Sequence, residues 1–155
     1  MAKRSNENTL SMTRTFPCSK ERLWQAWSDW ESAISWWGPV DWPAVSIEAD
    51  FRTGGEWRAE LRSKSGESLF QSGEFLEIIP TEKIVFTFLW EGDNHEDGPG
   101  ALTTVVVLIK ECEEGAVLEF SQTGLKSLAS VDGHQGGWMS TFDRLATQIA
   151  ELKDE

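Results

Sequence analysis

The sequence has no tyrosine and only two cysteines among its 155 residues. Cys18 and Cys112 lie far apart, no CxxC motif occurs, and neither thiol has a histidine at the spacing of a metal site. A disulfide framework and a zinc site are therefore disfavoured. One disulfide between the two thiols remains an alternative, but two reduced thiols in a cytoplasmic protein fit the sequence better.

Basic residues and long apolar segments are also scarce. The chain has 14 lysines and arginines against 26 acidic residues, and residues 74–155 alone hold 16 acids and 5 bases. Because no basic stripe occurs, we expect neither nucleic acid nor a membrane as a partner. The longest apolar runs, Ile84–Trp90 and Val105–Ile109, are too short to span a bilayer. The polar residues 1–8 predict a disordered tail rather than a signal peptide.

Tryptophan, in contrast, is abundant. The chain has nine tryptophans and eight phenylalanines, and six of the tryptophans fall between residues 24 and 42. Such a set brings large apolar surfaces with few polar groups. A chain of this length favours one domain with a core that needs no disulfide or metal, and we expect residues 9–155 to form it.

The first third of the chain reads as a strand followed by two short helices. Apolar and polar residues alternate from Leu10 to Phe16. Arg14 occupies one of the positions at which the other residues of this strand are apolar. Ser19 is placed to cap a short helix. Ser28 and Glu31 form a capping box, which predicts a second helical turn before the Gly-Pro pair at 38–39.

After residue 44, apolar residues recur at every second position. This spacing predicts strands at 45–51, 57–61, 69–79, 83–90, 102–110 and 116–122. Gly73 interrupts the third of these, where we expect a bulge or a close approach. A long helix follows, with Asp132 as its expected cap and Gly136 and Gly137 in its first turn. Its apolar stripe consists of Trp138, Phe142, Leu145, Ile149 and Leu152.

Strands joined by short turns form an antiparallel sheet, whose apolar face must be covered. The long helix is the only element large enough to cover it. The sequence therefore predicts an α+β fold, with a curved antiparallel sheet of six to seven strands wrapped around a long C-terminal helix and two short helices after the first strand. Such an arrangement leaves a cavity between the helix and the sheet.

Segments along most of the chain follow the pattern of one family. They are Thr13–Pro17, Leu23–Trp27, Trp36–Pro39, Asp50–Trp57, Gly73–Pro80, Val85–Thr87, and Gly137–Trp138 with Leu145. Together these segments resemble the family named for the C-terminal domain of the activator of heat-shock protein 90 ATPase, in the START-like (SRPBCC) superfamily. The resemblance covers about residues 11–152 and implies the helix-grip fold. The family includes co-chaperone domains and small-ligand binders, so it does not by itself define the function.

No catalytic constellation is recognisable. The chain has no GxSxG elbow, no phosphate-binding loop and no dinucleotide fingerprint. Residues 93–98 imitate half of a calcium loop, but the position of the bidentate glutamate falls on Thr104, which favours a solvated hairpin tip. His134 is expected to have a structural role. We therefore predict no catalytic residue, no metal and no cofactor.

The aromatic residues are the best candidates for a binding site, because ligand pockets are mostly apolar with a few polar groups. Arg14 would supply the polar group. The alternative is that the aromatic side chains are packed core and that Arg14 pairs with a carboxylate such as Glu119. The candidate ligand-binding residues are Arg14, Trp36, Trp37, Trp57, Trp138 and Phe142.

Three functions are compatible with these features. The first is non-enzymatic binding of a small hydrophobic ligand, aromatic or lipid-like. The second is a chaperone-associated interaction module that uses the acidic half of the chain, and the third, for which no acid–base pair is found, is an enzyme of the cyclase or hydrolase type. In the runs at 84–90 and 105–109, the residues that face either side of the strand are apolar. This pattern predicts that the outer face of the sheet is also covered, and a homodimer is one way to cover it.

Overall fold

The computed structural model describes residues 8–91 and 102–153, without the side chains of 151–153, and seven antiparallel strands form its sheet. Their order across the sheet is β1-β7-β6-β5-β4-β3-β2, so that the first strand pairs with the last and every other pair is a neighbour in sequence. This topology confirms the antiparallel sheet predicted from the short turns. The strands are β1 (Leu10–Phe16), β2 (Ala44–Ala49), β3 (Glu56–Arg62), β4 (Ser68–Ile79), β5 (Lys83–Trp90), β6 (Thr103–Cys112) and β7 (Gly115–Thr123).

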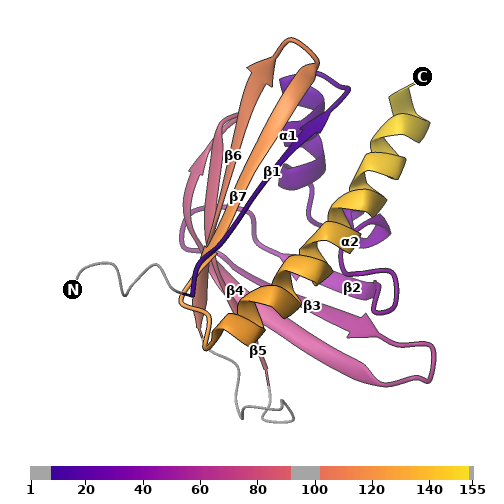
Figure 1. The fold of residues 1–155 in the computed structure, drawn as a ribbon, viewed down its shortest axis with the longest axis vertical. Coiled ribbons are helices and arrows are strands. Elements are labelled where there is room, and N and C mark those ends of the chain that lie inside the picture. The colour runs from indigo at the N-terminus through magenta and orange to yellow at the C-terminus, as the bar shows by residue number, and fades with distance from the viewer. Residues whose placement is uncertain (1–7, 92–101, 154–155) are drawn as a thin grey trace.

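One long helix, α2 (Leu128–Lys153), crosses one face of the curved sheet (Figure 1). Two short elements lie between β1 and β2, the helix α1 (Lys20–Ser28) and the 3-10 helix η2 (Ser32–Ser35). The arrangement is the predicted α+β fold of the helix-grip type. Within the described residues, none of the helices combines the length and the apolar content that a membrane crossing requires.

The caps of these helices were predicted only in part. Ser19 caps α1 as expected, since its side chain accepts a hydrogen bond from the Arg22 backbone N–H. The capping box of Ser28 and Glu31 is wrong, because it is the Asp29 carboxylate that accepts from both the N–H and the hydroxyl of Ser32.

The predicted start of the long helix at Asp132 is also wrong. The helix begins at Leu128, and the Ser127 hydroxyl accepts from the backbone N–H of Ser130. Gly136 and Gly137 consequently lie inside the helix and not in its first turn. Glycine lowers helix propensity by about 1 kcal/mol, but packing of the apolar stripe against the sheet outweighs this preference.

The core lies between α2 and the sheet and extends under α1 and η2. Trp138, Phe142, Leu145 and Ile149 are all buried, which confirms the predicted stripe over the part of the helix whose side chains are described. Trp27 is also buried, with ring centroids 5.1 Å from Trp36 and 6.2 Å from Phe142. The aromatic side chains therefore form one connected layer between the helical elements and the sheet.

Gly73 makes the close approach that its place in the strand pattern indicated. A Cβ atom there would lie 1.8 Å from the Thr87 carbonyl oxygen and 2.6 Å from the Trp57 Nε1 atom. The Trp57 indole donates to that same oxygen at 3.1 Å. The register of β4 against β5 also shifts between Phe75 and Glu77, so this region combines a bulge with a close approach.

Candidate functional site

A cavity of about 390 Å³ lies between the first half of α2, the segment 37–42 and the inner face of the sheet. Its volume falls within the range of small-molecule sites, roughly 300–1,000 Å³. Aromatic and aliphatic side chains form most of its wall, and a few polar groups are interspersed. The wall includes Trp37, Gln71, Phe88, Trp90, His134 and Trp138.

The helix contributes a wall of small side chains. Ala129, Gly133, Gly137 and Thr141 recur every four residues, which places them on one face of α2, and all four line the cavity. A Cβ atom built on Gly133 or Gly137 would meet no neighbouring atom within 4 Å. The two glycines therefore leave space open that larger residues would occupy.

Two indole groups are held by amide side chains of the sheet. Trp37 Nε1 donates to Gln71 Oε1 at 2.8 Å, and Trp138 Nε1 donates to Gln122 Oε1 at 2.9 Å. The Gln122 amide donates in turn to the Thr103 hydroxyl at 2.9 Å. Since Trp37 and Trp138 also contact each other edge to face at 5.5 Å, the aromatic wall of the cavity is fixed in position.

His134 on α2 connects a third indole to the helix backbone. Trp90 Nε1 donates to His134 Nε2 at 3.0 Å, and His134 Nδ1 lies 2.8 Å from the Ser130 carbonyl oxygen. Because Nε2 accepts, the proton of the neutral ring belongs on Nδ1, from which it is donated to Ser130. Burial lowers the pKa of His134, and the hydrogen bond to Ser130 opposes this shift in part. The imidazole is thus a neutral structural link in the cavity wall.

Arg144 fastens the segment that closes one end of the cavity. Its guanidinium group donates to the carbonyl oxygens of Ser35, Trp37 and Gly38 at 2.8–3.0 Å. The Ser140 hydroxyl accepts from the Val40 backbone N–H at 2.9 Å. Burial lowers the pKa of Arg144 from its ordinary value. The segment 37–42 is therefore attached to α2 through its backbone.

The six predicted site residues are only partly brought together. Trp37 and Trp138 line the cavity. Trp36, Trp57 and Phe142 are buried in the aromatic layer, where Trp57 hydrogen-bonds to Thr87 and Phe142 packs 5.3 Å from Phe120. These three support the cavity wall from behind and do not line it.

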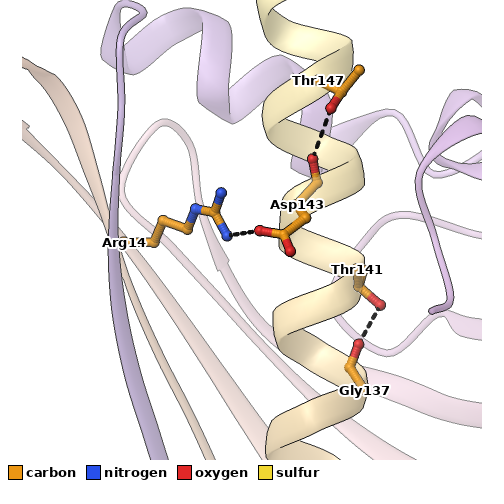
Figure 2. A network of polar contacts seen from close by, with 5 residues as sticks. All are labelled: Arg14, Gly137, Thr141, Asp143 and Thr147. Atoms are coloured by element: carbon orange, nitrogen blue, oxygen red, sulfur yellow. Dashed lines mark hydrogen bonds and ion pairs between the residues drawn. The ribbon is translucent and has the colours of Figure 1, made fainter. Parts of the chain in front are cut away.

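Arg14 faces the helix side of the sheet, as its parity in β1 indicated. Its guanidinium group donates to the Asp143 carboxylate on α2 at 2.6 Å, as Figure 2 shows. The alternative partner Glu119 is wrong, because Glu119 pairs with Lys110 at 3.2 Å. Arg14 is about one-third exposed and joins β1 to α2 outside the cavity.

Sequence reasoning missed Gln71, Trp90 and Trp42 as lining residues. Two signals could have found part of the site. Ala129, Gly133 and Gly137 share a four-residue spacing in a helical segment, and Gln71 stands among apolar residues at a buried strand position. Small residues along one helix face and a polar residue on an apolar strand face both indicate an internal space.

Metal chemistry finds no support in the described part of the chain. Among the described side chains of residues 8–91 and 102–150, no three histidines, cysteines, aspartates or glutamates are grouped as metal ligands would be. The 93–98 segment that imitates half of a calcium loop lies outside the described residues.

Fold and cavity together define a helix-grip protein of the START-like (SRPBCC) class. The family model described as "Activator of Hsp90 ATPase homolog 1-like protein" matches residues 17–150. The chain therefore belongs to this family, as its motifs indicated. A search among curated proteins found no match.

Solved structures of bacterial proteins share the fold over nearly the whole chain. The AHSA1 protein from Silicibacter pomeroyi is 26% identical with a TM-score of 0.78, and the match covers 93% of this chain and 99% of that one. A protein from Nitrosomonas europaea is 20% identical with a TM-score of 0.79, covering 96% and 98%. A protein from Arthrobacter aurescens is 20% identical with a TM-score of 0.81, covering 95% and 88%. At 20% identity, the last two show the fold alone.

Proposed function

We propose that the protein binds a small hydrophobic ligand in the cavity between α2 and the sheet, without catalysing a reaction on it. The observation that carries this proposal is the cavity itself, which has a volume of about 390 Å³. Phe88 and Trp90 line it from the sheet, Trp37 from the loop segment before β2, and Gly133, Gly137 and Trp138 from the helix. A packed protein interior leaves few voids larger than a water molecule. A space of this size, kept open by two glycines, is therefore better suited to a ligand than to stabilising the fold.

The hydrogen bonds of the wall support the same proposal. Trp37, Trp90 and Trp138 each donate their indole N–H to a side chain of the protein. Their rings consequently present apolar surface to the cavity and need no partner from a ligand. A preorganised apolar wall favours flat or aliphatic molecules over polar ones.

A fluorescence titration tests the proposal, because Trp37, Trp90 and Trp138 line the cavity and report on its contents. The chain is titrated with a panel of naphthalene derivatives, polyphenols and medium-chain lipids, and its melting temperature is measured with each. We expect saturable quenching and a higher melting temperature for some members. A panel that changes neither signal contradicts the proposal.

Membership of the family also supports a second candidate, an interaction with a chaperone. The family description names an activator of the Hsp90 ATPase, and residues 74–155 hold 16 acids against 5 bases. An acidic surface of this kind associates with a basic partner surface at a rate that falls steeply with salt. We expect purified heat-shock protein 90 to be retained by the immobilised protein at low salt and released at high salt. Absence of retention at low salt argues against this candidate.

A homodimer through the outer face of the sheet remains a prediction. Buried residues alternate with half-buried ones in β5 and along β6 as far as Ile109, and Val85, Leu89, Val106 and Leu108 are among the half-buried side chains. A second copy would cover this apolar surface. Light scattering should then give twice the mass of 17.4 kDa, and a monomer at working concentration would refute it.

A further inference from the structure

Gln71 is a buried polar residue in the wall of the cavity. It lies on β4 between Ala59 of β3 and Trp90 of β5, and it is only 4% exposed. Trp37 Nε1 donates to its side chain at 2.8 Å. Since an indole N–H can only donate, this contact identifies the accepting end of the amide as the oxygen Oε1.

The other end of the same amide is left to the cavity. No acceptor for Gln71 Nε2 is found among the described residues. The neighbouring Thr103 hydroxyl already donates to the Phe88 carbonyl oxygen at 2.8 Å and accepts from Gln122 at 2.9 Å. Because Gln71 lines the cavity, its Nε2 donor is available to an acceptor that enters this space.

The surroundings of Gln71 restrict the charge of that acceptor. Trp37, Leu61 and Phe88 are buried lining residues, and burial disfavours the charged form of the His134 imidazole. Placing a carboxylate beside a single neutral amide in this apolar region would leave the ion poorly solvated. The positive charge of Lys126 lies at the exposed rim. A neutral carbonyl oxygen fits the deep position better than an ion.

We propose that Gln71 determines the specificity of the cavity by donating a hydrogen bond from Nε2 to a neutral carbonyl group of an otherwise apolar ligand. A flat ketone, ester or amide belongs to this class, whereas a pure hydrocarbon would leave the amide without a partner. This inference rests on the proposed function, because it concerns the ligand of the same cavity.

The test compares two probes of similar size and shape, methyl naphthyl ketone and isopropylnaphthalene, in the wild-type chain and in Gln71→Met. Methionine keeps the length of the side chain but removes the amide donor. We expect the ratio of the two dissociation constants to shift about fivefold against the ketone in the variant, the worth of one hydrogen bond. Because methionine also removes the acceptor of the Trp37 indole, the affinity for both probes is expected to fall, and the ratio of the two constants isolates the loss of the Nε2 donor.

The infrared carbonyl stretch of the bound ketone provides a second readout, which needs only the wild-type chain. It should lie at a lower frequency than in hexane, because a hydrogen bond weakens the C=O bond. An unshifted stretch, or an unchanged ratio in Gln71→Met, overturns the assignment of Gln71 while binding of both probes upholds the proposed function. If neither probe binds at all, the proposed function fails and this inference fails with it.

Discussion

Gly73 shows how a single residue positions an aromatic ring of the core. The absence of a side chain lets the Trp57 indole reach the Thr87 carbonyl oxygen at 3.1 Å. A methyl group in its place would lie 1.8 Å from that oxygen. Trp57 is thereby held in the core beneath the cavity wall, which explains why a tryptophan on the inner face of the sheet does not line the cavity.

Gly73→Ala should therefore destabilise the protein by about 2–3 kcal/mol, because the β4–β5 pair must shift and the indole loses its acceptor. Urea denaturation measures this change. Gly136→Ala is the control, since Gly136 lies inside α2 where a Cβ atom meets no neighbour within 4 Å. The free energy of unfolding of Gly136→Ala should exceed that of the wild type by up to about 1 kcal/mol. Equal stability of Gly73→Ala and the wild type would contradict the account of this residue.

His134 gives the protein a pH dependence whose direction follows from its environment. Burial lowers its pKa in the folded state below the ordinary value. As pH falls below about 6.5, the unfolded chain binds the proton first, so the folded state loses stability until the lowered pKa is passed. The contribution of His134 is fully present above pH about 6.5.

We accordingly expect the free energy of unfolding to fall between pH 7.5 and 5.5, about the range in which histidine titrates. In His134→Gln, which can still accept from the Trp90 indole at this place, the fall should be smaller. Chemical denaturation of both proteins at the two pH values measures the difference. The same fall in both proteins would show that the pH dependence arises elsewhere.

At the scale of elements, two arginines in different environments connect α2 to the rest of the fold. Arg144 donates to three backbone carbonyl groups around η2 and the segment 37–42. Arg14 reaches α2 from β1 through one ion pair, whose partners are 33% and 69% exposed (Figure 2). An exposed ion pair adds little to the free energy of unfolding, whereas a half-buried guanidinium group that donates to several carbonyl groups adds more.

Arg144→Met should lower stability by about 2 kcal/mol and weaken ligand binding, because the wall that contains Trp37 loses its attachment to the helix. Lysine cannot replace the planar fork of donors, so Arg144→Lys should recover only part of the loss. Arg14→Met is the matched control and should cost under about 1 kcal/mol. Thermal unfolding and the fluorescence titration measure both effects, and equal losses in the two methionine variants would contradict this assignment.

At the scale of the whole molecule, the sequence predicts the order of elements because each has its own period. Apolar residues alternate with polar ones from Leu10 to Phe16 and form a stripe from Trp138 to Ile149. Both patterns depend only on which side of the strand or helix faces the core. The start of α2 was misplaced because Asp132 and Gln135 have the spacing of a capping box, whereas the helix already begins at Leu128. Gly133, Gly136 and Gly137 therefore lie within the helix, and Gly133 and Gly137 line the cavity.

The site could be predicted only in part for a related reason. Periodicity assigns a side chain to a face of the sheet but not to a position over that face. Trp57 and Trp138 share the inner side, yet only Trp138 lines the cavity. Arg14 also faces inward, but its distance to Asp143 in another element decides its role. The sequence shows Gln71 among apolar residues, but its hydrogen bond to the Trp37 indole, 34 positions away, depends on the tertiary structure.

The most direct test of ligand binding in this cavity fills it from the helix side. Gly137→Leu places a side chain where the glycine leaves space, and Gly136→Leu places the same side chain on the exposed side of the helix. Both variants should be at least as stable as the wild type, because glycine inside a helix costs about 0.5–1 kcal/mol. We expect the fluorescence titration to show that Gly137→Leu no longer binds the probes that the wild type binds, while Gly136→Leu binds them normally. Undiminished binding by a folded Gly137→Leu variant would contradict the central claim that the ligand occupies this cavity.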